Sequence, residues 1–432
     1  MKRILFSLLL CVVCLAAKTE SAMALDEFIQ QHGEHLFETQ QNQLLQTFQS
    51  KGLFWNTEDK HQIRYAANLA KQPLTFGGLQ ITEAVFQFNE KLNLSSIRIS
   101  VYNRGDCGKW SVKKFENTVQ TLQECLGKIS GDRAPVNSSR RIQNTRIFQT
   151  LWHAPGYDAA LRWSRSKEVT EYISIQFAGH KEIEALGDDM KTDVSKDTLA
   201  HRIEEAPGGD RWISVPMVKQ TGSYCMPAVM ERFMRYYNSS VDQHIIAQIV
   251  QSDSTIGTNM TTAIEVLRKN AVKLKIKVRV IYQDDAFREL PKFRRLIHDY
   301  NQKAKKTEAY TVDEKSLKEG KNINLSGIIF SMDPEIFMQV RQKRRPGTDG
   351  FFGIVKESID KGIPLLWSVV LFPEKEAEQQ SGFHARIING YNKEKGEIIY
   401  TDSWGPGHEK KSMKTEKAWA TTLGIYGITP RQ

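Results

Sequence analysis

The chain has 432 residues, of which 40% are hydrophobic and 25% charged, a composition typical of globular proteins rather than of disordered or collagen-like chains. Its formal net charge is +10, but the basic residues are spread along the chain and are not interleaved with aromatic residues as on a nucleic-acid-binding surface. We therefore expect no nucleic-acid partner, and we expect the short basic clusters at residues 140–141 and 341–345 to be solvated surface. At roughly 100 to 200 residues per domain, the length predicts two domains.

Residues 1–24 have the pattern of a secretory signal peptide. A basic start at residues 2–3 precedes an almost uninterrupted apolar run at residues 4–17, and residues 22–24 give the small-x-small pattern that a signal peptidase accepts. The apolar run is shorter than the roughly 20 residues that span a bilayer. We predict a cleaved signal, with a retained anchor as the alternative, and hence a secreted or periplasmic protein without stable membrane insertion.

Three cysteines follow this segment, Cys107, Cys125 and Cys225. In an oxidising compartment an odd number leaves either a free thiol or an intermolecular bridge. Because Cys107 and Cys125 are close in the sequence, a disulfide between them is the simplest pairing, with its geometry left open. That pairing would leave Cys225 as the free thiol.

Residues 25–205 have the pattern of a mixed α and β N-terminal domain without a catalytic constellation. His32 and His35 have the spacing of metal ligands, but no further ligands cluster nearby, so we interpret them as a surface pair. We favour an accessory domain over an inhibitory propeptide, and a binding module stays open as an alternative. The apolar spacing predicts a hairpin of residues 85–88 and 97–101, helices around 115–126 and 158–165, and a strand at 173–177.

The segment Ala-Pro-Gly-Gly-Asp at residues 206–210 interrupts both helix and strand, so we predict a domain boundary there. Downstream, in residues 211–432, helical patterns come first and strand patterns last, which indicates an α+β fold. The helices are expected at 225–237, 242–250 and 260–269, the strands at 278–282, 365–372, 385–390 and 397–401, and a polar loop at 303–321.

Cys225 stands at the start of a predicted helix, after a loop that contains Gly222 and Ser223. The partial positive charge of a helix N-terminus favours the thiolate and lowers a thiol pKa that starts near about 8.5. Pro227 falls in the first helical turn, where its missing N–H costs little. Cys225 is therefore a candidate nucleophile, although a cysteine before a helix is often only a small buried residue.

A second candidate segment is a predicted hairpin with His384 where one strand begins and Asp402 where the other ends. Antiparallel pairing brings these two ends side by side. The carboxylate can then orient one imidazole nitrogen and leave the other for a thiol, which is the arrangement of nucleophile, base and orienting group.

In this order Gln220, Cys225, His384 and the Asp-Ser-Trp-Gly sequence from Asp402 resemble the papain-like cysteine peptidases. The resemblance implies a C-terminal domain made of a helix-rich lobe and an antiparallel β lobe. It implies that Gln220 helps to hold the oxyanion, that Cys225 is the nucleophile and that His384 is the base. It also implies that Asp402 orients the histidine and that Trp404 shields this pair. The spacing from Gln220 to Cys225, and Asp in place of Asn, look closer to the bacteriocin-processing, double-glycine leader peptidases.

One departure concerns the residues after the nucleophile, because Met226 and Pro227 replace the familiar papain signature. The resemblance implies hydrolysis of a peptide or isopeptide bond in a peptide or protein substrate, through an acyl-enzyme and without a metal or organic cofactor. Two alternatives stay open: an inert domain that binds peptides, and an acyl transferase or cell-wall peptide amidase that uses the same thiol. The sequence does not determine the substrate or the oligomeric state.

Overall fold

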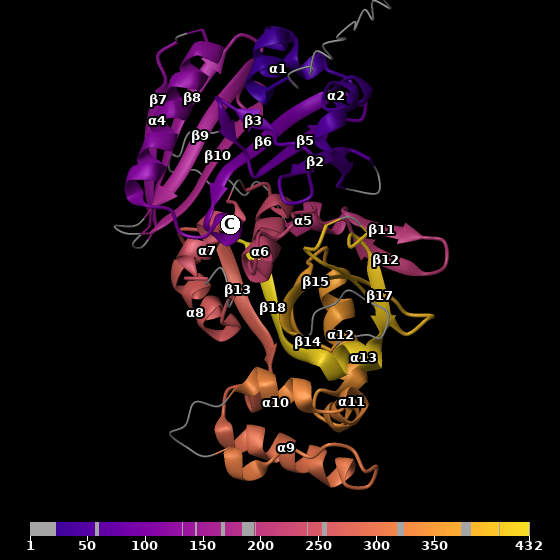
Figure 1. Cartoon of the computed structure of the whole chain (residues 1–432). Coiled ribbons are helices and arrows are strands. Elements are labelled where there is room, and N and C mark those ends of the chain that lie inside the picture. The colour runs from indigo at the N-terminus through magenta and orange to yellow at the C-terminus, as the bar shows by residue number, and fades with distance from the viewer. Residues whose placement is uncertain are drawn as a thin grey trace, which may run out of the picture.

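The computed structural model describes residues 23–431 except 57–59, 132, 143–144, 166–168, 184–193, 195, 240, 253–256, 318–323, 373–381 and 406. The predicted signal peptide therefore lies almost entirely outside the described residues. The chain forms two large antiparallel sheets, one above the other in Figure 1, each with its own helices. No helix within the described ranges is both long and apolar enough to cross a membrane.

The first sheet has the strand order β1-β2-β5-β6-β10-β9-β8-β7. Together with its helices it forms what we call the N-terminal unit. Its strands are β1 (Phe54–Trp55), β2 (Gln62–Ala66), β5 (Glu83–Phe88), β6 (Leu94–Asn103), β7 (Val136–Ile142), β8 (Thr145–Ala154), β9 (Tyr157–Arg165) and β10 (Thr170–Ala178). Its other elements are α1 (Leu25–His32), α2 (Gln41–Thr47), α3 (Arg104–Cys107), α4 (Val112–Ile129), the small hairpin β3 (Thr75–Phe76) and β4 (Leu79–Gln80), and 3-10 turns at Gly33–Glu38 and Gln49–Lys51.

Most elements predicted for this unit are confirmed, and one is wrong. The predicted hairpin is β5 and β6, and the inward side chains of β5 alternate with half-buried ones as expected for a strand with one face on the core. Residues 158–165, predicted as a helix, instead lie in β9 between β8 and β10. Pairing on both edges outweighs the weak helix preference of a short segment.

The second sheet has the strand order β11-β12-β15-β14-β18-β13, and β16 and β17 extend it from β15. With its helices it forms the C-terminal unit. Its strands are β11 (Ile203–Ala206), β12 (Asp210–Ile213), β13 (Ile276–Gln283), β14 (Leu365–Leu371), β15 (Gly382–Asn392), β16 (Glu397–Thr401), β17 (Lys411–Lys414) and β18 (Thr422–Pro430). Its helices are α5 (Lys196–Ala200), α6 (Cys225–Tyr236), α7 (Gln243–Ile249), α8 (Met260–Asn270), α12 (Gly347–Ile359) and α13 (Thr415–Thr421). The mixture of helices and antiparallel sheets agrees with the α+β prediction.

Residues 206–210 are the turn of the hairpin between β11 and β12. Both strands belong to the second sheet, because β12 pairs with β15. The Pro-Gly-Gly sequence thus makes a tight turn within the C-terminal unit instead of a linker between the units. The division of the chain into independently folding domains stays a prediction.

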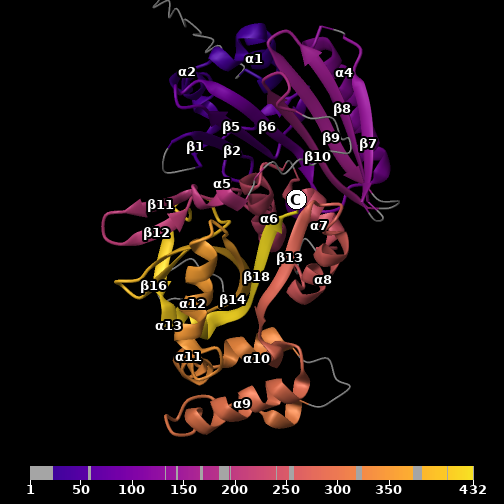
Figure 2. The same ribbon diagram turned by 180° about the vertical axis from the view of Figure 1, so that it is seen from behind.

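The segment between β13 and β14 carries a third, smaller core. It contains a 3-10 turn (Asp285–Phe287), α9 (Leu290–Ala304), a second 3-10 turn (Glu314–Ser316), α10 (Leu325–Ser331) and α11 (Pro334–Gln342), and it forms the lower end of the molecule in Figure 2. Arg341 was expected on a solvated surface, but it is 2% exposed and ion-paired with Asp284. Its guanidinium also donates to the carbonyls of Ala420 and Thr422, so it links α11 to the region around α13.

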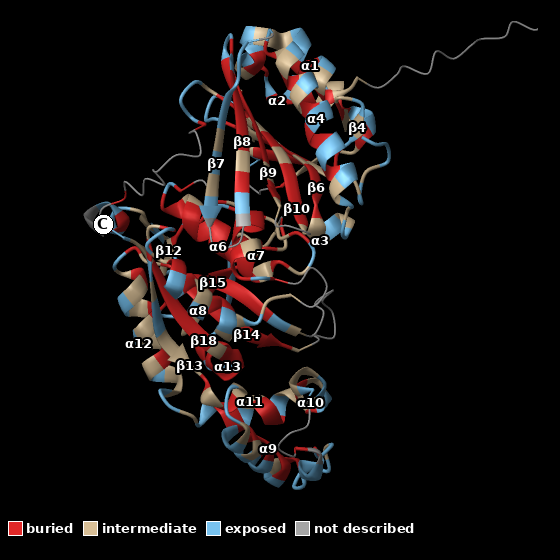
Figure 3. Ribbon diagram, turned by 90° about the vertical axis from the view of Figure 1, so that its left-hand side faces the viewer, coloured by how far each residue is buried: buried red, intermediate tan, exposed pale blue. Residues whose placement is uncertain are grey.

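The two units meet where α6 and α7 lie under the first sheet (Figure 1). Helix α7 contacts β8 and β10 of that sheet, and α6 contacts β15 of the second sheet. Figure 3 shows α6 as almost entirely buried, because it is enclosed by both units. The helix that begins at Cys225 is therefore a central element of the fold.

Candidate active site

The hairpin of β15 and β16 brings His384 and Asp402 together. In its register Ile387 faces Thr401, so Asp402 directly follows the paired end of β16 and lies near the beginning of β15. His384 Nε2 is 2.6 Å from Asp402 Oδ1. His384 is 7% exposed and Asp402 is fully buried, so water does not screen this pair.

Arg386, which the sequence analysis did not single out, holds the other oxygen of the carboxylate. Its Nε donates to Asp402 Oδ2 at 2.8 Å, and the Ser403 N–H donates to Asp402 Oδ1 at 2.8 Å. Burial acts to raise the pKa of Asp402, but His384 and Arg386 outweigh it and hold this pKa well below its usual range. The period-two alternation of a strand, which puts residues 384 and 386 on one face, is the sequence signal that could have identified Arg386.

The carboxylate in turn changes the imidazole. Burial acts to lower the pKa of His384, whereas the charge and hydrogen bond of Asp402 and the contact with Cys225 raise it to about 9. Trp404 stacks on the His384 ring with the centroids 4.6 Å apart. The Arg386 guanidinium lies 5.7 Å from the centre of the Trp404 ring, so one aromatic side chain covers both cations of the site.

Cys225 is the first residue of α6 and is half-buried. Its thiol is hydrogen-bonded to His384 and to the backbone N–H groups of Ala385 and Met226. Burial acts to raise the pKa of Cys225, but these hydrogen bonds and the imidazolium charge outweigh it, so this pKa lies below the ordinary thiol value. Since Asp402 occupies Nε2 of the imidazole, Nδ1 is the nitrogen available to the thiol.

Gln220 lies beside these groups, at the start of what we call the nucleophile loop, residues 220–224. Its backbone N–H donates to the Ser403 carbonyl at 2.8 Å, and its Oε1 accepts from Ser403 Oγ at 2.9 Å. Its Nε2 donates to the Gly222 carbonyl at 2.9 Å, which uses one of the two N–H groups of the amide. The structure thus brings together all four residues predicted for the site.

Arg232 connects the two sides of the site from the interior. It is fully buried two turns after Cys225 on α6, and its guanidinium donates to the carbonyls of Asp402 and Pro216 and to Thr401 Oγ1. Burial lowers the pKa of Arg232 to about 10. The helix that carries the thiol is therefore joined directly to the strand end that carries the carboxylate. A charged residue seven positions after the cysteine, on the same helix face, was the available sequence signal.

The expected disulfide between Cys107 and Cys125 is not formed, and both are free thiols. Cys107 lies before α4, whereas Cys125 is near its far end, 13 residues beyond Val112. At about 1.5 Å per residue the helix separates the two by roughly 20 Å, and a disulfide needs Cα atoms within about 7 Å. Burial raises the pKa of Cys107 and raises that of Cys125 to about 11, which is opposite to the shift at Cys225.

Residues 292–427 match the model of the Peptidase_C39 like family. The C-terminal region is similar to C39 peptidases. The matched span of this C39-like region contains His384 and Asp402 and begins after Cys225, and the match supports a peptidase of the cysteine type. No curated protein matches the chain. Among the described residues no cluster of three or more His, Cys, Asp or Glu side chains is arranged to hold a metal ion.

Proposed function

We propose that this protein is an exported cysteine peptidase that hydrolyses peptide or isopeptide bonds in a peptide or protein substrate. The observation that carries the proposal is the chain of contacts from Cys225 through His384 to Asp402, in which the thiol pKa is lowered and the imidazole pKa is raised. Opposite shifts of this kind favour a thiolate and imidazolium pair at neutral pH, which is the reactive form of a thiol peptidase. Within this proposal the C-terminal unit has the papain-like lobes, and residues 1–24 direct export to the periplasm or the medium.

In the first half-reaction, the Cys225 thiolate attacks the carbonyl carbon and forms a C–S bond while the carbonyl electron pair moves to oxygen. The backbone N–H of Cys225 and the Gln220 amide donate to this oxyanion. When the C–N bond breaks, the His384 imidazolium gives its proton to the leaving amine. A thioester and a neutral imidazole remain.

In the second half-reaction, His384 takes a proton from water, and the resulting hydroxide attacks the thioester carbon. The C–S bond breaks, the acid product leaves, and the thiolate and imidazolium are restored. Asp402 keeps its charge throughout and orients the ring, in line with the low pKa that Arg386 and His384 give it.

The direct test is intact-mass analysis after treatment with an epoxide probe for thiol peptidases, with peptide mapping of the adduct. We expect one adduct, on Cys225, because the pKa values of Cys107 and Cys125 are raised. The adduct should be lost in Cys225→Ala and strongly slowed in His384→Ala. Hydrolysis of fluorescein-labelled casein should fall by about 10⁴-fold or more in Cys225→Ala.

Each alternative hypothesis predicts a different result in the same assays. Equal labelling of Cys107 and Cys225, or equal hydrolysis by wild type and Cys225→Ala, would refute the proposed triad. Labelling of Cys225 without hydrolysis, followed by ligation when an amine acceptor is added, would favour an acyl transferase. A folded protein that is neither labelled nor active would favour an inert peptide-binding domain.

A further inference from the structure

The nucleophile loop is held by the N-terminal unit as well as by its own. The Gly222 N–H donates to Asp106 Oδ1 at 3.1 Å, across the boundary between the two units. Asp106 is itself fixed at the corner between β6 and α3, where its N–H donates to Asn103 Oδ1 at 2.7 Å and its Oδ2 accepts from Asn103 Nδ2 at 3.1 Å. A backbone N–H three residues before the nucleophile is therefore hydrogen-bonded to a carboxylate that the N-terminal unit holds in place.

The two backbones at this corner approach too closely for side chains. A Cβ on Gly222 would lie 2.7 Å from the Gly105 carbonyl oxygen, and a Cβ on Gly105 would lie 2.9 Å from Thr221 Cγ2. Gly222 also has a positive φ of 49°, which L side chains rarely adopt. Glycine at both positions thus permits direct contact between the corner and the nucleophile loop.

A second contact reaches the residue immediately before Cys225. The Tyr224 hydroxyl donates to Glu171 Oε1 at 2.7 Å, and Arg104 Nε donates to Glu171 Oε2 at 2.8 Å. Tyr224 and Glu171 are fully buried. Arg104 also donates to the Ser252 carbonyl at 2.8 Å, so the network returns to the C-terminal unit.

Glu171 lies at a β-bulge in β10. The pairing of β10 with β9 shifts register between Thr170 and Tyr172, which leaves Glu171 as an extra residue on the strand. A bulge of this kind re-aims a side chain that would otherwise follow the alternation of the sheet. The carboxylate accepts from the hydroxyl of the tyrosine that precedes the nucleophile.

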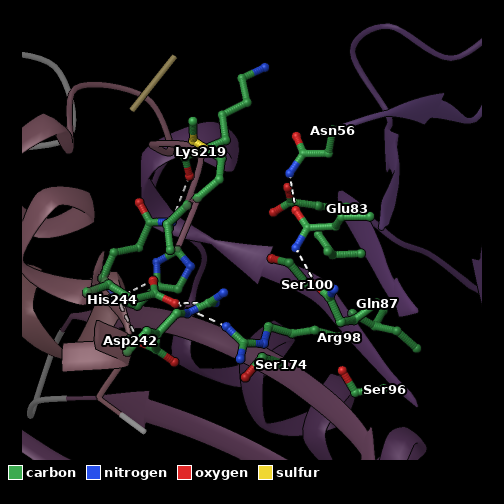
Figure 4. A pocket seen from close by; sticks show the side chains of 18 residues that line it. Asn56, Glu83, Gln87, Ser96, Arg98, Ser100, Ser174, Lys219, Asp242 and His244 are labelled. Carbon is green, nitrogen blue, oxygen red and sulfur yellow. Dashed lines mark hydrogen bonds and ion pairs between the residues drawn. The ribbon is translucent and has the colours of Figure 1, made fainter. Parts of the chain in front are cut away.

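The neighbouring part of the same interface is open by comparison. A polar cavity of about 290 Å³ separates the units there, and Figure 4 shows Asn56, Glu83 and Arg98 of one unit opposite Lys219, His244 and Asp242 of the other. The long side chains of Arg98 and Glu231 form an ion pair of 3.0 Å across this interface. The close contacts at residues 222 and 224 stand out against this loosely packed region.

We propose that Asp106, Glu171 and Arg104 are positioning residues of the N-terminal unit that hold the nucleophile loop in its reactive geometry. This inference rests on the proposed peptidase function. Gly222 and Tyr224 lie in the loop immediately before Cys225, so their anchors fix the position of both the nucleophile and one oxyanion donor, the Cys225 N–H. A displacement of about 1 Å at such a site can cost about 100-fold in rate. The N-terminal unit therefore supports catalysis instead of blocking it.

The experiment compares Tyr224→Phe, Glu171→Gln and Asp106→Ala with wild type in the full-length protein. Two rates are measured across pH: casein hydrolysis, resolved into kcat and KM, and alkylation of Cys225 by iodoacetamide. We expect kcat to fall by about 10- to 100-fold with KM nearly unchanged, and the pH dependence of alkylation to shift. Asp106→Asn keeps an acceptor oxygen for the Gly222 N–H and should restore most of the activity lost in Asp106→Ala.

Arg140→Gln is the matched control, because Arg140 crosses the same interface but donates to the Lys273 carbonyl, at 2.8 Å, outside the nucleophile loop. It should leave kcat and the alkylation profile unchanged. The proposal is refuted if the three variants lose thermal stability but their folded fraction keeps wild-type kcat, or if their activity rises, as release of an inhibitory segment would predict. A wild-type protein with neither hydrolysis nor selective labelling of Cys225 would instead refute the peptidase function itself.

Discussion

His384 and Asp402 are held by a single hairpin, whereas the loop before Cys225 is held from two units. His384 lies on β15 and Asp402 directly follows β16. Arg386 and Ser403 contact the carboxylate, and Trp404 stacks on the imidazole. The nucleophile loop takes contacts from Ser403 and Gln243 on one side and from Asp106 on the other.

The two sides of the site differ in how far apart in the sequence their contacting residues lie. The hairpin is local, so a short sequence specifies it, and it lies within the span that matches the C39-like family model. The nucleophile loop depends on residues more than a hundred positions earlier, in a part of the chain outside that match. The base side of the site thus lies within the matched span, whereas the support of the thiol side comes from residues outside it.

Among the variants that test this difference, the largest loss of activity is expected from Gln220→Ala. This change removes the side chain that joins the nucleophile loop to the Ser403 hydroxyl. Loss of one oxyanion donor should lower kcat by about 100- to 1000-fold. Ser403→Ala is the control, because it removes only the hydroxyl that contacts Gln220 Oε1 and keeps the amide donor. Steady-state kinetics showing equal losses in both variants would mean that Gln220 orients the loop without binding the oxyanion.

The next effect is expected from Asp402→Asn, which should lower kcat/KM by about 100-fold. Asp402 raises the pKa of His384 to about 9, so activity of the wild type should fall as pH rises through that value. Without the negative charge the imidazolium loses its proton at lower pH, so the alkaline limb of the kcat/KM profile should shift to lower pH. An unchanged limb would show that another group sets it.

The same pair makes a prediction for stability. Because the folded pKa of His384 lies above its ordinary value of 6.5, its stabilisation is complete below about pH 6.5 and is lost as pH rises through about 9. Cys225, whose pKa is lowered, contributes the opposite pH dependence, so the comparison is made in a Cys225→Ala background. There the melting temperature should drop more between these pH values with Asp402 present than with Asp402→Asn. Thermal unfolding at the two pH values measures this difference.

The smallest effect on activity is expected from Arg386→Gln, because Asp402 keeps its contacts with His384 and Ser403. Breaking a buried pair should nevertheless lower the free energy of unfolding by about 3 kcal/mol. Arg98→Gln is the matched variant at the unit interface, where the Arg98 side chain is 42% exposed and Arg235 stays paired with the buried Glu231, so it should cost about 1 kcal/mol or less. Chemical denaturation of both variants compares the hairpin with the interface, and equal losses would contradict the difference in burial.

The elements predicted from periodicity were mostly confirmed, and the errors have a common origin. Residues 158–165 carry a helix-compatible sequence, yet strands on both edges make them a strand. Arg341 was predicted to be a surface charge, but in the structure it is buried and paired with Asp284. The Cys107–Cys125 disulfide was plausible from separation along the chain, but the length of α4 keeps the two thiols apart. In each case the outcome depends on how whole elements pair or pack, which the pattern of a single segment does not specify.

By itself the sequence determined the local parts of this protein: a cysteine at a helix start, a histidine and aspartate at the ends of one hairpin, and an α+β arrangement of the second half. Period and turn chemistry are enough for such features, because they depend on residues near one another in the chain. Only the tertiary structure decided that Arg386 and Arg232 hold the carboxylate side, and that Asp106 and Glu171 reach the thiol side. Those contacts join different elements, and no local pattern encodes which distant side chain a buried polar group will meet.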